Sequence, residues 1–87
     1  MTLETLAAMP HVTGVKQVTK AVGKGRAACV FVASDADGRV TRSLKELKEL
    51  CADVGVELVE NATMAELGRA CSIEVGSAAA AALRESR

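Results

Sequence analysis

The segment GVKQVTKAVGKGRAACVFVA, residues 14–33, decides the fold because it predicts an amphipathic helix followed closely by a buried strand. Val15, Val18 and Val22 recur at the spacing of one helix face. Residues 28–33 then form a continuous apolar run, which is typical of a strand covered on both faces. A helix that leads into such a strand predicts an α/β fold.

The opposite face of the same helix is cationic. Lys16, Lys20 and Lys24 recur every four residues, Gln17 lies beside them, and Thr13 is the predicted N-cap. Lysines at this spacing repel one another slightly in an isolated helix, so a polyanionic partner would explain the arrangement. Two interpretations stay open from the pattern alone: a surface that contacts RNA, or an ordinary solvated helix face.

Composition limits the class of protein. A chain of 87 residues predicts a single domain over residues 1–87, and 49% hydrophobic with 25% charged residues is typical of a folded globular protein. One Phe with no Trp or Tyr excludes an aromatic platform for base stacking. The formal net charge is zero, yet residues 11–42 carry six basic and two acidic side chains. That local excess indicates that the protein binds an anionic partner through one limited surface. It argues against a protein that coats nucleic acid generally.

The three cysteines argue against a metal centre and against disulfides. Cys29, Cys51 and Cys71 are far apart, include no C-x-x-C pair, and have only His11 as a companion ligand. We therefore predict buried thiols in a reducing compartment, with no cofactor. The N-terminus lacks the pattern of a secretory signal and no apolar run reaches the ~20 residues of a membrane span. We expect a soluble, cytoplasmic monomer.

The rest of the first two thirds of the chain predicts one more helix before the buried strand, and a helix and a strand after it. A short helix from Leu3 is closed by Pro10. Residues 42–54 predict a longer helix, whose apolar face would be Leu44, Leu47, Leu50, Cys51 and Val54. Residues 56–59 predict a second buried strand. The alternation of helices and strands predicts a three-layer α/β/α sandwich.

The last third of the chain gives one clear signal and one conflict. Thr63 and Glu66 have the spacing of a capping box, which would begin a helix that runs to about Cys71. Gly68 inside that helix costs about 1 kcal/mol relative to alanine, so we expect close packing against a neighbouring backbone. The helix propensity of alanine predicts a helix for residues 77–83 (SAAAAAL). Tertiary context could make the same residues a strand instead.

Asp35 and Asp37 are the strongest enzyme signal. They follow the buried strand, at the end where α/β folds often bind ligands, and two carboxylates there could hold Mg²⁺ and a phosphate. A structural role is the alternative: one Asp turns the chain with Gly38 and one caps the next helix. We favour the structural role because no second carboxylate cluster completes a metal site. A small metal-dependent phosphotransfer enzyme and a protein-interaction domain remain the alternative functions.

Four motifs in one order resemble the ribosomal L7Ae/L30e family. They are Gly14-Val15-Lys16-Gln17-x-x-Lys20, the strand leading to Asp35-Ala36-Asp37, the helix with Glu66-Leu67-Gly68, and Ile73-Glu74-Val75-Gly76. The chain is similar above all to the small bacterial members, which bind kink-turn RNA. The resemblance implies a four-stranded mixed sheet with residues 77–83 as its last strand, so here it overrules the alanine propensity.

The resemblance also implies a function and a site. It implies a non-enzymatic, ribosomal-protein-like RNA-binding protein, which recognises the tandem sheared G·A pairs of a kink-turn and stabilises the bent RNA. Lys16 and Gln17 stand where the family has Asn and Glu, and Lys20 matches the family lysine. The expected RNA-contacting residues are Thr13, Gly14, Val15, Lys16, Gln17, Lys20, Lys24, Ile73, Glu74, Val75 and Gly76. The implied partner is a ribosomal or regulatory RNA.

Overall fold

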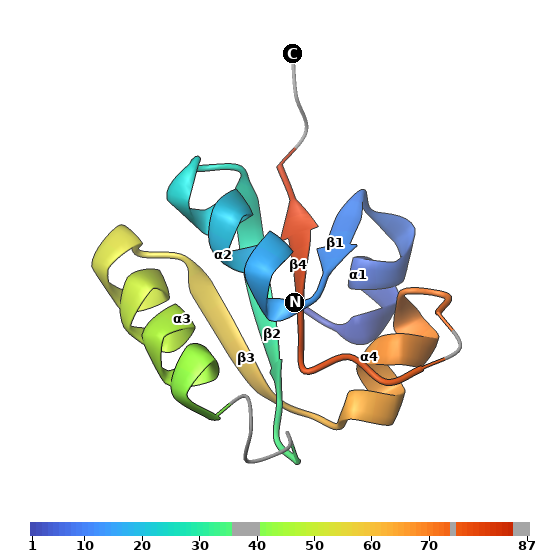
Figure 1. Ribbon diagram of the computed structural model, residues 1–87. Coiled ribbons are helices and arrows are strands. Elements are labelled where there is room, and N and C mark those ends of the chain that lie inside the picture. Colours follow the sequence, from blue (N-terminus) through green and yellow to red (C-terminus); the bar gives the residue numbers. More distant parts are fainter. Residues whose placement is uncertain (36–40, 74, 85–87) are drawn as a thin grey trace.

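The computed structural model describes residues 1–35, 41–73 and 75–84, and its helices and strands alternate as predicted (Figure 1). The elements in chain order are α1 (Leu3–Ala8), β1 (His11–Thr13), α2 (Val15–Gly23), β2 (Ala27–Ala33), α3 (Thr41–Val54), β3 (Glu57–Ala62), α4 (Met64–Ala70) and β4 (Ala79–Leu83).

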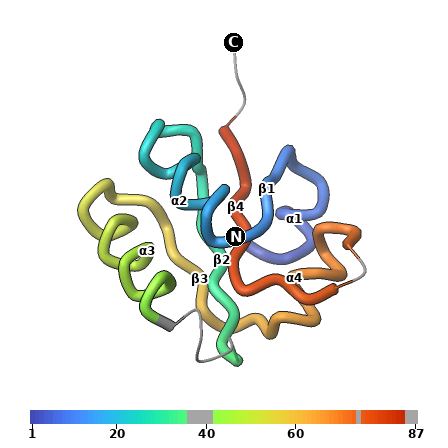
Figure 2. Tube along the Cα trace, in the orientation of Figure 1, coloured from blue at the N-terminus to red at the C-terminus, as the bar shows by residue number. Residues whose placement is uncertain are grey.

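The four strands form one mixed sheet in the order β1-β4-β2-β3. β2 and β3 are parallel, whereas β4 runs antiparallel to both of its neighbours, β1 and β2. Helices α2 and α3 cover one face of the sheet, and α1 and α4 cover the other (Figures 1 and 2). The predicted three-layer α/β/α sandwich with a four-stranded mixed sheet is therefore confirmed.

The alanine run forms the strand β4, as the family resemblance implies and as local propensity does not. The strand begins at Ala79, two residues later than the predicted Ser77, whose buried hydroxyl donates to the Ala79 carbonyl oxygen at 2.6 Å. Residues 79–82 are 0% exposed because strands flank them on both sides and helices cover both faces. Pairing on two sides satisfies the backbone of β4, which outweighs the preference of alanine for a helix.

Two sequence predictions about apolar residues are wrong. The strand predicted at residues 56–59 is present as β3, but it is not buried: β3 lies at the edge of the sheet and most of its side chains are partly or fully exposed. Its Glu60 pairs with Lys48 of α3 at 2.8 Å, as an exposed edge permits. Val54 is 48% exposed rather than part of the apolar face of α3, because it lies in the last turn, beyond Cys51.

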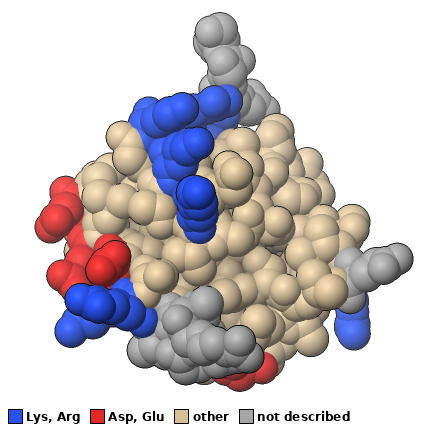
Figure 3. Space-filling model, in the orientation of Figure 1, with Lys and Arg blue, Asp and Glu red and all other residues tan. Residues whose placement is uncertain are grey.

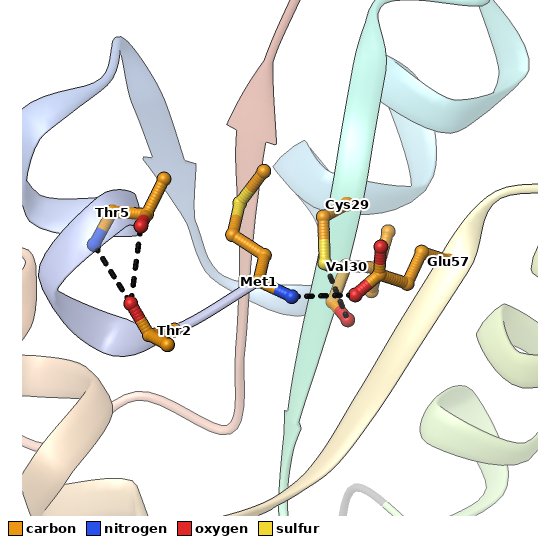
Figure 4. A network of polar contacts seen from close by, with 6 residues as sticks. All are labelled: Met1, Thr2, Thr5, Cys29, Val30 and Glu57. Atoms are coloured by element: carbon orange, nitrogen blue, oxygen red, sulfur yellow. Dashed lines mark hydrogen bonds and ion pairs between the residues drawn. The ribbon is translucent and has the colours of Figure 1, made fainter.

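A polar network ties the N-terminus to the edge strand (Figure 4). The Met1 amine donates to Glu57 Oε2 at 2.7 Å, and Thr2 is the N-cap of α1. This contact raises the pKa of the Met1 amine and lowers the pKa of the Glu57 carboxyl. Cys29 lies beside it on β2, and burial raises the pKa of its thiol to about 11. All three cysteines are buried and unbridged, as predicted.

Candidate nucleic-acid interface

Helix α2 separates its apolar and cationic residues onto opposite faces. Val18, Ala21 and Val22 are buried against the sheet and α3. The polar side chains are all exposed: Lys16, Gln17, Lys20 and Lys24. Figure 3 shows Lys and Arg side chains gathered over α2 and the turn that follows it. The cationic face predicted from the lysine spacing is therefore a continuous surface of the folded domain.

The N-terminus of α2 is built differently from the prediction. Thr13 is not the N-cap: it belongs to β1, where it pairs with Ala80, and Gly14 caps the helix with φ 89°. The positive φ explains the glycine, because other residues adopt this conformation only with strain. The Gly14 amide donates to Ala79 at 2.9 Å, which joins the helix start to β4. No side chain caps the helix, so its first-turn amides can face an anion.

The residues around position 75 form the second predicted contact surface. Val75 is 72% exposed, Gly76 is exposed and Ile73 is half-buried, whereas Glu74 lies outside the described residues. Because this segment leads into β4, and Ala79 of β4 accepts from Gly14, its end approaches the start of α2. Both predicted surfaces therefore adjoin the end of the sheet at which β4 begins.

The backbone of this loop is anchored on α4. The Ile73 amide donates to the Gly68 carbonyl at 2.9 Å, and the Ser77 amide donates to the Met64 carbonyl at 3.1 Å. A Cβ at Gly68 would collide with the Val75 carbonyl oxygen, so only glycine permits this approach. The close backbone packing predicted at Gly68 is confirmed, and its partner is the loop that carries Val75.

Two predicted contact residues have little exposed side chain. Thr13 and Val15 are both half-buried, and Val15 packs against the core between α2 and α3. Their expected contribution to a ligand is therefore through the backbone at the start of the helix. The predicted contact residues with exposed side chains along α2 are thus Lys16, Gln17, Lys20 and Lys24.

Sequence reasoning missed Arg26 as a member of this surface. A cavity of about 270 Å³ runs along α2, and it is lined by Val12, Gln17, Lys20, Ala21, Lys24, Arg26 and Leu83. Arg26 lies beyond the end of α2, so the periodicity of the helix could not place it. The local excess of basic residues was the only signal in the sequence that included it.

Asp35 has a structural role, although a different one from that predicted. Its Oδ1 accepts from the Met64 amide at 2.8 Å, so it helps to cap α4 rather than the next helix along the chain, α3. Thr63 and Glu66 form the predicted capping box at the same helix start. Asp37 lies outside the described residues. Within residues 1–35, 41–73 and 75–84, no three His, Cys, Asp or Glu side chains cluster as metal ligands.

This contact predicts a difference between two substitutions at position 35. Asp35→Ala should lower the free energy of unfolding by about 1 kcal/mol, because it leaves the Met64 amide without its acceptor. Asp35→Asn should cost much less, since its amide oxygen can accept the same bond. Urea unfolding followed by circular dichroism measures both, with exposed Asp53→Ala as the control. Equal losses for Ala and Asn, or a stoichiometric Mg²⁺ site abolished by either, would contradict this role.

The fold and this surface define a small α/β/α domain that presents one cationic helix start beside an apolar loop. The sequence profile of the ribosomal protein L7Ae/L30e/S12e/Gadd45 family matches residues 5–87. The chain therefore belongs to this family, as the sequence motifs suggested. Among the residues that the structure describes, no helix is both long and apolar enough to cross a membrane.

Individual relatives agree with this assignment. A protein named as RNA-binding from Caldanaerobacter subterraneus is 46% identical over 71 residues, which cover 82% of this chain and 83% of that protein. The large ribosomal subunit protein eL8 of Halobacterium salinarum is 46% identical over 68 residues, covering 78% of this chain and 55% of that protein. The solved 15.5kD RNA binding protein of Giardia lamblia has a TM-score of 0.83 at 27% identity, covering 97% of this chain and 69% of that one.

Proposed function

We propose that this protein is a non-enzymatic RNA-binding protein that recognises kink-turn RNA and stabilises its bent form. The observation that carries the proposal is the exposed row of Lys16, Gln17 and Lys20 at a helix start without a side-chain cap. Relatives named as RNA-binding or as ribosomal proteins support the same class of partner.

The geometry of RNA favours a kinked target over a straight duplex. The major groove of an A-form helix is too deep and narrow for side chains to read, whereas an internal loop that bends the RNA opens the groove. A helix start could then enter it with its first-turn amides and the positive end of its dipole toward phosphate. Such a complex would stabilise the bent RNA, because only the bent form exposes the base edges.

Each side chain has a distinct part in this proposal. Gln17 both donates and accepts, so it can form paired hydrogen bonds with a base edge of the sheared G·A pairs. Lys16 and Lys20 donate only, to guanine acceptors or to phosphate. Val75, with Gly76 beside it, offers an exposed apolar surface on which an unstacked loop nucleotide can rest.

The proposal is tested by titration with two RNAs of equal length. One contains a kink-turn with tandem G·A pairs, and the other is an uninterrupted duplex. We expect clearly tighter binding to the kink-turn and, with a fluorophore on each end of the RNA, closer ends in the complex. Equal affinity for both RNAs, or binding without bending, would contradict the proposal.

The loop surface gives a separate prediction. Val75→Asp should weaken binding to the kink-turn RNA by on the order of tenfold, because a carboxylate would repel the RNA and the apolar contact would be lost. The fold should survive, since Val75 is 72% exposed. Val54→Asp is the matched control, because Val54 is also exposed but lies on α3. The same affinity for both variants would remove the loop from the site.

A further inference from the structure

The cationic surface continues past the end of α2 into a second group of basic residues. Lys24, Arg26 and Arg84 are all exposed: Lys24 is the C-cap of α2, Arg26 lies in the turn before β2, and Arg84 follows β4. We call these three residues the distal basic patch. Arg26 and Arg84 lie beyond the C-terminal end of α2, whereas Lys16, Gln17 and Lys20 of the proposed RNA site lie nearer its N-terminal end.

Backbone contacts hold the distal basic patch in one place. The Arg26 amide donates to the Ala21 carbonyl at 2.9 Å, which folds the turn after α2 back onto the helix. The Arg84 amide donates to the Arg26 carbonyl at 2.7 Å, so the two arginines lie on neighbouring strand ends. Arg84 Nε also donates to the Ala27 carbonyl at 3.4 Å, which orients the guanidinium. Arg26 and Arg84 are therefore held beside each other at one end of the sheet, next to the C-cap residue Lys24.

A groove connects the distal basic patch to the proposed RNA site. The 270 Å³ cavity described above has an apolar floor of Val12, Ala21 and Leu83. Its polar rim begins at Gln17 and Lys20, which belong to the proposed site, and ends at Lys24 and Arg26. An apolar floor with cations along its rim suits a ribose-phosphate strand, because riboses can cover the floor while phosphates meet the cations.

We propose that the distal basic patch binds backbone phosphates of the duplex stem adjoining the kink. The inference rests on the proposed function, because it uses the α2 N-terminus as the point where the kink binds. Ten residues separate Gly14 from Lys24, or about 15 Å at about 1.5 Å per residue. An A-form RNA stem rises somewhat less per base pair than the about 3.4 Å of B-form DNA, so the contacted phosphates lie on the order of five base pairs from the kink.

The test compares three kink-turn RNAs that differ only in stem length. In the first, both stems extend about ten base pairs, well past the patch; in the others, one stem at a time is trimmed to about three base pairs. The variant is the double substitution Arg26→Gln with Arg84→Gln. Arg42→Gln with Arg69→Gln is the matched control, since it removes the same charge from exposed positions on α3 and α4.

We expect the patch variant to lose about five- to tenfold in affinity for the long RNA, and to lose almost nothing once the contacted stem is trimmed. The slope of log affinity against log salt should also fall by nearly two, as expected for two lost phosphate contacts. The control pair should bind all three RNAs like the unaltered protein.

Three results would overturn the inference. Equal losses on long and trimmed RNAs would mean that the patch acts through general charge, and an unchanged affinity would mean that it serves another anion, such as an acidic protein segment. A loss as large in the control pair would exclude a local contact. Failure of the unaltered protein to prefer kink-turn RNA over straight duplex is a different result, because it removes the proposed function and the inference together.

Discussion

Replacing Gly68 with alanine is expected to lower the free energy of unfolding by about 2 kcal/mol and to weaken binding to kink-turn RNA on the order of tenfold. The new Cβ would collide with the Val75 carbonyl, so either α4 or the loop must move. The gain in helix propensity, about 1 kcal/mol, offsets only part of this cost. Because the chain has no Trp or Tyr, unfolding is best followed by circular dichroism in urea.

The chain offers a matched control for this substitution. Gly23 also lies in a helix, but a Cβ there would meet nothing within 4 Å. Gly23→Ala should therefore leave stability unchanged or raise it by up to about 1 kcal/mol. If Gly68→Ala behaved like Gly23→Ala, in stability and in RNA affinity, the anchoring of the loop on α4 would have no functional consequence.

Gln17→Ala and Lys20→Ala are each expected to cost about 1 to 3 kcal/mol in binding to a kink-turn RNA. The loss of binding free energy should be smaller for an RNA whose G·A pairs are disrupted, because that RNA lacks the base edges that these side chains would contact. Stability should change by no more than about 0.5 kcal/mol, since both side chains are exposed. Calorimetry against both RNAs at two salt concentrations measures these effects.

Two further lysine substitutions, one inside the site and one outside it, distinguish base recognition from general charge attraction. Lys16→Ala should weaken binding to the intact RNA and to the G·A-disrupted RNA by a similar factor. It should also reduce the salt dependence of binding, as expected for a phosphate contact. Lys45→Ala on α3 is the control for a lysine outside the site, and it should leave binding unchanged. Equal losses on intact and disrupted RNAs for all three site variants would show that α2 supplies charge without reading bases.

Features set by residues near one another in sequence could be predicted well. The capping box of Thr63 and Glu66 needs only a spacing of three residues, and it is present in the structure. The cationic face of α2 follows from a repeat of four. At Gly68, an interior glycine in a helix was enough to predict close backbone packing, although it could not name Val75 as the partner.

Features that depend on distant residues could not be predicted in the same way. Thr13 looked like an N-cap, but pairing with Ala80 of β4 places it in a strand. Asp35 caps a helix whose first residue is 29 positions away. The alanine strand was assigned from family resemblance, because its own propensity favours a helix and its stabilising neighbours lie elsewhere in the chain.

The order β1-β4-β2-β3 has a consequence for how the chain reaches its native state. The strand that comes last in sequence is an inner strand, so β1 and β2 have no partner on their facing sides until residues 79–83 insert between them. Many of these pairings join residues more than 50 positions apart, such as Val12 with Ala81 and Val30 with Ala81. Contacts so distant in sequence slow folding, and unpaired edges invite aggregation. During synthesis, therefore, the sheet would close in its final step, after every other element has left the ribosome.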